Sequence, residues 1–253
     1  MILLAIECSS KTASAAIFES GADAPDSAPS GSGALLGQVF LNAGLTHSET
    51  LLPMISQLLE QTRVSAGRLE ALAITNGPGS FTGLRIGIST VLGLAWARAL
   101  PCLGVSSLEA AAWNVAHMGK PICSVMDARR GRVYRALFTA DSGACPPRPA
   151  RLTDDRAVPL ETLFDELRGD SILVGDGAFM CYNAFGDTLP VTLAPEHLRY
   201  PTGCGTALAA LAAGPSAFHG ADTLRAAYCS GAEKYQYSPK NKGERTYERR
   251  NDS

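Results

Sequence analysis

The chain has 253 residues, of which 46% are hydrophobic and 18% charged, and its formal net charge is -2 at pH 7. This balance is typical of a globular protein with one large domain or two small ones, and it supplies enough apolar residues for a real core. A net charge this close to zero gives no general attraction to phosphate backbones, which argues against a chain that grips nucleic acid unaided. Any binding of RNA should be shared with a partner.

The cysteines and the first residues indicate a cytoplasmic location. Seven cysteines are scattered along the chain without a C-x-x-C pair, which fits reduced thiols better than a disulfide framework or a zinc site. The apolar run after Met1 ends at Glu7, lacks a basic start and is too short for a signal peptide or a membrane span. We therefore expect no membrane association.

The amino-terminal part of the chain predicts several strands and one amphipathic helix. Apolar residues recur at helical spacing over about residues 47–63, behind a capping box formed by Thr46 and Glu49. Residues 20–33 contain only small, polar or turn-forming residues, and we expect a mobile hairpin tip there. The strands expected in this part are residues 2–6, 14–18, 35–41 and 72–75.

The most informative segment is residues 76–87, a glycine-punctuated loop that leads directly into a helix with almost no polar face. Over residues 81–100 only Arg85 and Arg98 are charged. Such a helix must be covered on both faces, whereas the sheet of a small chain covers only one. Each large aliphatic side chain left in water forfeits roughly 1.5–3 kcal/mol, so we expect a partner on the second face. The residues predicted to bind it, from this helix and the preceding one, are Leu51, Leu52, Ile55, Leu58, Leu59, Gly83, Leu84, Gly87, Ile88, Val91 and Leu92.

A second, reduced unit follows. Ser106 and Glu109 repeat the capping-box spacing after a short strand, and the helix that they open should end at Gly119. A basic turn over residues 128–132 joins two strands and repeats the amino-terminal hairpin. Residues 140–158 are predicted to be a connection. Further expected elements are strands at 122–126, 133–138 and 171–174, and helices at 159–169, 178–185 and 206–213.

These elements divide the chain into three segments. Residues 1–105 form the first unit with the partner-binding helices, and residues 106–233 form the second. Residues 234–253 are polar and basic, with almost no aliphatic side chains, which is typical of a disordered tail.

The glycine loop also permits an anion site. Backbone N–H groups and the positive end of the helix favour phosphate, yet the loop lacks the lysine of a G-x-x-x-x-G-K-[ST] motif. Glycines serve equally well to make the turn, and at Gly83 and Gly87 to let another helix approach closely. We favour this structural role and leave the phosphate hypothesis open. Its candidate residues are Glu7, Gly77, Gly79, Ser80, Thr82 and Arg85.

The histidines, serines and cysteines of the chain do not form a pattern that indicates an enzyme. His47 is followed one helical turn later by Leu51 and not by a second histidine, and the other histidines are isolated, so we expect no metal site. No G-x-S-x-G elbow is present, and the Cys8 thiol has no identifiable base. We expect no catalytic residues and no cofactor held by this chain alone.

Four motifs together resemble the TsaB (YeaZ) family. They are residues 6–10 after the first strand, 47–53 on the first helix, the glycine segment 77–87, and 127–131 at the second hairpin. The resemblance spans residues 1 to about 233, and the glycine segment is its specific part.

The resemblance implies an α/β fold of the actin and sugar-kinase (ASKHA) type with two related halves. It also implies a role in making threonylcarbamoyladenosine beside the anticodon of tRNAs that read codons beginning with A. In that family the chain is a non-catalytic partner of the related transferase TsaD, which it binds as a heterodimer through its two amino-terminal helices. The ATPase TsaE joins this assembly, TsaC supplies threonylcarbamoyl-adenylate, and tRNA binds through the complex. Since the partner is homologous, a homodimer should compete when the chain is alone.

Two other classes remain open at this point. The first is an ATP-dependent small-molecule kinase of the same superfamily, in which Glu7 and the glycine loops would be active-site parts. The second is a metallopeptidase, which would need a bound metal. A nucleotide at the boundary with the partner is also kept open.

Overall fold

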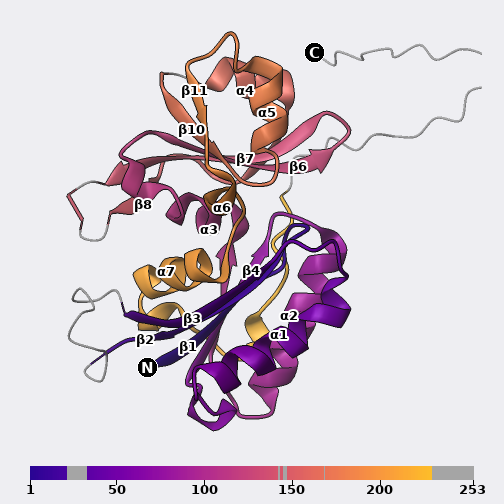
Figure 1. The fold of residues 1–253 in the computed structure, drawn as a ribbon, viewed down its shortest axis with the longest axis vertical. Helices are drawn as coiled ribbons and strands as arrows, with labels where there is room; N and C mark the ends of the chain where they lie inside the picture. Colours follow the sequence, from indigo (N-terminus) through magenta and orange to yellow (C-terminus); the bar gives the residue numbers. More distant parts are fainter. Residues whose placement is uncertain (22–32, 142, 145–146, 168, 230–253) are drawn as a thin grey trace, which may run out of the picture.

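The computed structural model describes residues 1–21, 33–141, 143–144, 147–167 and 169–229, which form two α/β units (Figure 1). Most of the hairpin tip expected at 20–33, and the whole tail at 234–253, lie outside these ranges.

The first unit is built on a five-stranded sheet in the order β3-β2-β1-β4-β5. The central strand β1 pairs antiparallel with β2 and parallel with β4. Every residue of β1 is buried because helices cover both faces of the sheet, and this explains its uninterrupted apolar sequence. The strands are β1 (Ile2–Glu7), β2 (Ala13–Glu19), β3 (Ala34–Leu41), β4 (Ala71–Gly77) and β5 (Cys102–Ser106).

Two helices lie on each face of this sheet (Figure 1). Leu4 and Ile6 of β1 share a core with α1 (His47–Gln61) and α2 (Phe81–Trp96). Leu3 and Ala5 alternate with them and share the opposite core with α3 (Ser107–Trp113) and α7 (Gly203–Ala213).

The second unit repeats the strand order of the first. Its sheet runs β8-β7-β6-β10-β11, with antiparallel strands on one side of the central β6 and parallel strands on the other. Helices α4 and α5 cover one face, and α3 covers the other, so α3 lies between the two sheets. The expectation of two related α/β halves is therefore confirmed. The elements are β6 (Ile122–Arg129), β7 (Arg132–Asp141), β8 (Arg148–Arg151), β9 (Arg156–Pro159), β10 (Ser171–Val174), β11 (Val191–Leu193), α4 (Leu160–Glu166), α5 (Ala178–Phe185) and α6 (Glu196–Arg199).

Several expected boundaries change. Residues 140–158 are not a simple connection, because they include most of β8 and β9, which both pair with β7. Their Pro and Arg residues are tolerated since an edge strand is hydrogen-bonded on one side only. The sequence does not predict β11 and α6, which are too short to show a periodic pattern. Short 3-10 turns lie at Ala66–Arg68, Ala116–Met118, Pro215–Ala217 and Ala221–Thr223.

The helix ends are also refined. The apolar helix expected to reach residue 100 ends at Trp96. The helix capped by Ser106 ends at Trp113, and Gly119, with a φ of +67°, ends the 3-10 turn that follows. Thr46 precedes α1 as expected, but its hydroxyl donates to the Glu49 carboxylate and does not cap the helix.

The last described residues return to the first unit, although the prediction assigns them to the segment 106–233. After α7 a segment that we call the C-terminal strap, residues 219–228, runs beside β5 and α2. Its His219 exchanges backbone hydrogen bonds of 2.7 and 3.0 Å with Cys102, and its Ala221 and Leu224 enter the core beneath α1 and α2. The strands of the first sheet end near residue 105 and those of the second sheet follow, but α7 and the C-terminal strap belong again to the first unit.

Helix α2 lies very close to the end of β1. A Cβ atom on Gly83 would lie 2.2 Å from the backbone oxygen of Cys8, and one on Gly87 would lie 2.1 Å from Cys8 Sγ. These glycines therefore allow α2 to pack closely against Cys8 at the end of β1. From the sequence we expect them to allow the close approach of another helix. A Cβ on Gly93 of the same helix would meet nothing within 4 Å.

We expect Gly87→Ala to lower the free energy of unfolding by about 1–3 kcal/mol, since the added methyl overlaps a sulfur atom in a closed core. Gly93→Ala is the control in the same helix, and it should raise that free energy by roughly 0.5–1 kcal/mol because alanine is the better helix former. Urea unfolding followed by circular dichroism measures both. Equal effects of the two substitutions would contradict the packing of α2 on β1.

Candidate functional site

Most helix residues predicted to bind a partner are instead buried within this chain. The apolar stripe of each helix faces the sheet that it covers, so these side chains contact this chain's own core, and their role in binding a partner stays a prediction. Helix α2 is also flanked by α1 and by Leu224 of the C-terminal strap. Of the predicted set only Leu52, Leu59 and Leu92 keep part of their surface accessible. The buried residues are Leu51, Ile55, Leu58, Gly83, Leu84, Gly87, Ile88 and Val91.

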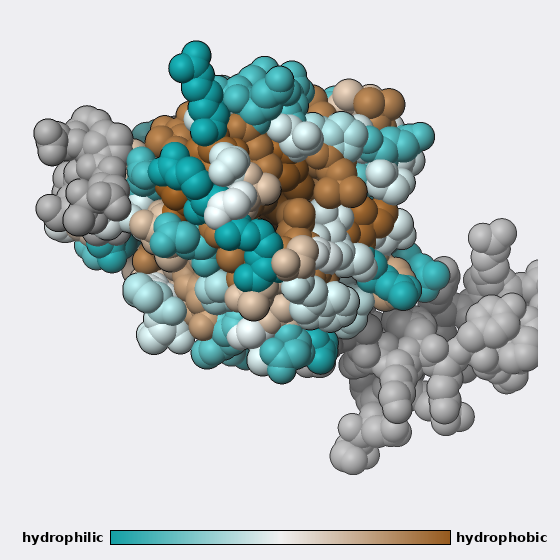
Figure 2. Space-filling view, turned by 90° about the horizontal axis from the view of Figure 1, so that it is seen from below, coloured by the Kyte–Doolittle hydropathy of each residue, from teal (hydrophilic) through white to brown (hydrophobic). Residues whose placement is uncertain are grey.

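The part of the two helices that remains at the surface is what we call the outer helix face: Leu52, Ile86, Leu92, Gly93 and Trp96. Leu52 is 55% exposed and Trp96 is 69% exposed. Ile86 and Leu92 are half-buried. Hydrophobic side chains gather on the side of the molecule seen from below, the end at which α1 and α2 lie in Figure 1 (Figure 2). Exposed apolar residues that cluster in this way are typical of an interaction surface.

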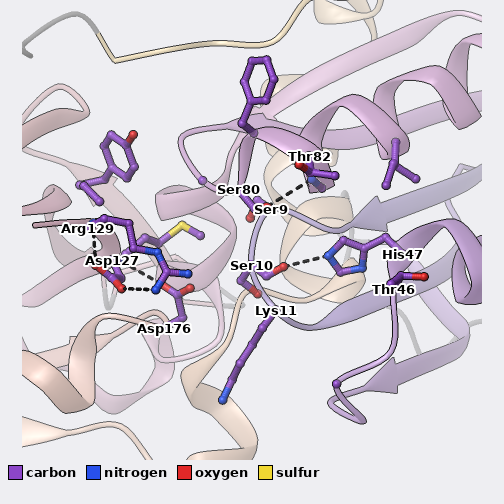
Figure 3. A pocket seen from close by; sticks show the side chains of 18 of the residues that line it. Ser9, Ser10, Lys11, Thr46, His47, Ser80, Thr82, Asp127, Arg129 and Asp176 are labelled. Carbon is purple, nitrogen blue, oxygen red and sulfur yellow. Dashed lines mark hydrogen bonds and ion pairs between the residues drawn. The ribbon is translucent and has the colours of Figure 1, made fainter.

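A cleft of about 760 Å³ lies between the two units. One wall is formed by the turn after β1, the start of α1 and the loop before α2, and the other by the end of β6 and the loop after β10 (Figure 3). Among the side chains that line it are Ser9, Ser10, Lys11, Thr46, His47, Ser80, Thr82, Asp127, Arg129 and Asp176.

The glycine loop fixes the start of α2 in the cleft wall. Gly77 and Gly79 have φ values of +136° and +154°, which other residues rarely adopt. A Cβ on Gly79 would lie 2.2 Å from the backbone oxygen of Ser9, and Ser80 N donates to the same oxygen at 2.6 Å. The Ser80 hydroxyl also accepts a hydrogen bond of 3.2 Å from Gly83 N and caps the helix.

Glu7 lies beneath this wall and does not line the cleft. Its Oε1 accepts hydrogen bonds from Ser9 N at 2.6 Å, from the Ser9 hydroxyl, and from the Thr75 hydroxyl at 3.4 Å. Burial raises the pKa of Glu7 to about 8, against the opposing effect of the Ser9 hydrogen bonds. Glu7 is therefore largely a neutral, structural acid at pH 7. It does not reach the cleft, where the phosphate and kinase hypotheses need a carboxylate.

The other candidate phosphate residues divide between the cleft and its surroundings. Gly79, Ser80 and Thr82 line the cleft. Gly77 does not, because the backbone of the C-terminal strap packs against it: a Cβ there would lie 2.2 Å from Ala227 O. Arg85 lies outside the lining as well, with its guanidinium 5.1 Å from the centre of the Phe81 ring.

The sequence reasoning missed the acidic groups of the opposite wall. Asp127 forms an ion pair of 3.2 Å with Arg129 and accepts a hydrogen bond of 2.7 Å from its backbone N–H. Asp176 accepts from Asp127 N at 3.1 Å, and burial raises its pKa to about 6. A signal was available, because Asp176 follows the end of a strand and Asp127 lies near the end of another, as Glu7 does in the first unit.

His47 and Cys8 serve the packing of the first wall. His47 Nε2 lies 2.9 Å from the backbone oxygen of Ser10 and ties the start of α1 to the turn after β1. Cys8 is buried, and desolvation raises the pKa of its thiol well above the ordinary range, which makes it a poor nucleophile. Among the described residues no group of three or more His, Cys, Asp or Glu side chains could hold a metal ion. None of the helices described is long and apolar enough to cross a membrane.

Part of the chain is similar in sequence to known proteins. Residues 41–143 match the family model of TsaD, tRNA N6-adenosine threonylcarbamoyltransferase. Over 97 residues the chain is 38% identical to the tRNA threonylcarbamoyladenosine biosynthesis protein TsaB of Bacillus subtilis, an alignment that covers 38% of this chain and 42% of that protein. Over 98 residues it is 40% identical to TsaB of Escherichia coli, with the same coverage of 38% and 42%. The alignments thus span less than half the length of these curated relatives.

A solved structure extends the likeness to nearly the whole fold. YeaZ from Pseudomonas aeruginosa superposes with a TM-score of 0.72 and 24% sequence identity, over 90% of this chain and 99% of that one. Together with the repeated sheet order, this confirms the expected two-lobed, actin-like α/β fold.

We expect Glu7→Gln to flatten the pH dependence of stability. The pKa of Glu7 is about 8 in the folded chain and 4.5 without the fold, so the stability that depends on the neutral acid is full below pH 4.5 and is lost as the pH rises towards 8. Glutamine keeps the acceptor for Ser9 and has no proton to lose. The variant should gain stability relative to the wild type across this window, by an amount on the order of a few kcal/mol.

Denaturant unfolding at a series of pH values measures this gain. Glu60→Gln, at an exposed carboxylate of α1, is the control and should keep the wild-type profile. A Glu7→Gln profile parallel to the wild type would show that Glu7 is ionised in the folded chain.

Proposed function

We propose that this chain is a member of the TsaB (YeaZ) family and a non-catalytic subunit that docks on the transferase TsaD in the synthesis of threonylcarbamoyladenosine in tRNA. The observation that carries the proposal is the outer helix face. This face exposes large apolar side chains on α1 and α2, the two helices through which the family resemblance expects the chain to bind its partner.

Gly93 strengthens this argument. Glycine in the middle of a helix costs about 0.5–1 kcal/mol relative to alanine, and no neighbouring atom of the described chain requires it at this position. The glycines at 83 and 87, by contrast, are explained by Cys8. An exposed glycine between Leu92 and Trp96 allows the backbone of a second helix to approach closely, so we place the nearest contact with the partner there.

TsaD suits this face because it is related to the chain itself. The part of the chain that resembles the TsaD family, residues 41–143, includes both α1 and α2. A related partner can present an equivalent pair of helices, and two such pairs form a four-helix seam. The same surface can pair with itself, so we propose that a homodimer competes when TsaD is absent.

The rest of the assembly follows from this role. In the proposed complex TsaE joins the heterodimer, tRNA binds through the complex, and the chain acts in the cytoplasm where tRNA is modified. It needs no cofactor of its own. A nucleotide at the boundary with TsaD is the one cofactor that we propose to test, by equilibrium dialysis of ATP and ADP against the chain, TsaD and the mixture.

Gly93→Leu should abolish capture of TsaD while the isolated chain stays folded, since leucine is a good helix former and its Cβ meets no neighbour in the monomer. Pull-down with tagged TsaD measures the loss, and thermal unfolding of the isolated variant checks its fold. Asn183→Leu adds the same side chain at an exposed position of α5 in the second unit and should not affect capture. Equal capture by wild type and Gly93→Leu would remove the outer helix face from the interface.

Reconstitution with purified components tests the role itself. We expect modification of tRNA by TsaD, TsaE and TsaC to require this chain, and we expect the chain alone to modify no tRNA and to turn over no ATP. Steady ATP turnover by the purified chain would favour the kinase alternative. That hypothesis is already weakened by the burial of Glu7.

A further inference from the structure

Two exposed aromatic rings stand at the mouth of the cleft. Phe81, the first residue of α2, and Tyr228, near the end of the C-terminal strap, stack with ring centres 5.8 Å apart and an interplanar angle of 29°. Phe81 is 57% exposed and Tyr228 is 59% exposed, so the stack leaves more than half of each residue in contact with solvent. We call this pair the aromatic lip. Neither the core nor the outer helix face uses it.

One cationic side chain contacts the lip, and two others line the same cleft. The Arg85 guanidinium lies 5.1 Å from the centre of the Phe81 ring. Lys11 and Arg129 line the same cleft as Phe81, from opposite walls (Figure 3). Lys11 is held over the Tyr200 ring at 5.2 Å, and Arg129 is paired with Asp127.

The hairpin tip that carries Arg129 adds a further cation. Arg129 and Arg130 have φ values of +67° and +55°, in the left-handed region that favours glycine and asparagine. Within the described part of the chain, Arg130 has neither an ion-pair nor a hydrogen-bond partner for its exposed side chain. The turn therefore exposes an unpaired guanidinium, at a conformational cost, one residue after Arg129, which lines the cleft.

Exposed rings flanked by cations suit single-stranded nucleic acid better than a protein surface. A base stacks on an aromatic face whatever its sequence, and lysine and arginine contact the phosphates on either side. The core of a protein interface is instead depleted of charge. Asp127 and Arg129 neutralise each other as an ion pair, and Asp176 is hydrogen-bonded to Asp127 N, so the cations left for phosphate are Lys11 and Arg130.

We infer that the aromatic lip stacks on an unpaired base of the RNA substrate, and that Lys11 and Arg130 contact the neighbouring phosphates. The inference rests on the proposed function, which brings tRNA to the complex. It adds a direct contact between this chain and RNA, limited to a few charges, in agreement with a net charge of -2 for the whole chain.

The test uses the complex with TsaD and a fluorescent RNA hairpin that carries an anticodon loop, with binding followed by anisotropy over a series of salt concentrations. Phe81→Ala and Tyr228→Ala should each weaken binding about 5- to 150-fold, which is the loss of stacking on one base. Phe81→Tyr should retain wild-type affinity. Lys11→Ala and Arg130→Ala should each reduce the salt slope by about 1.

Phe179→Ala is the matched control. Phe179 is also exposed, at 53%, with the Arg199 guanidinium 5.9 Å from its ring, but it lies on α5 and does not line the cleft. It should bind RNA like the wild type. Wild-type affinity in the Phe81 and Tyr228 variants would overturn the inference, and so would a parallel loss of TsaD capture, which would assign the lip to the protein interface.

The failure of the proposed function would be visible separately. If wild-type chain does not capture TsaD, the proposed function falls, and the lip is then tested by ultraviolet crosslinking of the chain alone to the same hairpin at low salt. Crosslinks at Phe81 or Tyr228 would support the lip without the complex. Crosslinks elsewhere, or none, would overturn it.

Discussion

The close packing of α2 on the end of β1 orients both candidate surfaces. Gly83 and Gly87 have no side chains to separate the helix from Cys8, so the helix lies against the strand backbone along its inner side. The large apolar residues of that side enter the core. Its opposite side, with Gly93 and Trp96, must then face outward. The same contact brings the first turn of α2 into the wall of the cleft, so one close approach determines where a partner and a ligand can bind.

The two halves use equivalent carboxylates in different ways. Glu7 and Asp127 each lie near the end of the central strand of their sheet, and each accepts a hydrogen bond from the backbone N–H two residues later, at 2.6 and 2.7 Å. In the described part of the first half no cation pairs with the acid, and burial keeps it largely neutral. In the second half Arg129 pairs with it, and the carboxylate stays at the cleft. A duplicated local geometry thus became structural in one half and part of a polar wall in the other.

The sequence predicts the fold better than the site. Long elements such as α1 and the strands of the first sheet carry clear periodicity, and their positions are confirmed within a few residues. Most of the residues predicted to bind a partner are buried in this chain's own core, since an apolar stripe shows that a helix is covered but not by what. The C-terminal strap could not be predicted, because its contacts with Cys102 and Asn76 join residues more than a hundred positions apart. Asp176 was missed because its role depends on the second unit facing the first.

The contrast between the two helices indicates how a partner and RNA could bind together. Beside Leu52, the surface of α1 carries polar residues, among them Gln57 and Glu60, which suit the rim of an interface, whereas α2 exposes Gly93 and Trp96, which suit its centre. Phe81 lies at the other end of α2. At a rise of 1.5 Å per residue, it is about 22 Å from Trp96 along the helix axis. A protein seated over Gly93 and Trp96 therefore need not cover the aromatic lip, and a single helix can hold the partner near one end and a base of the RNA at the other.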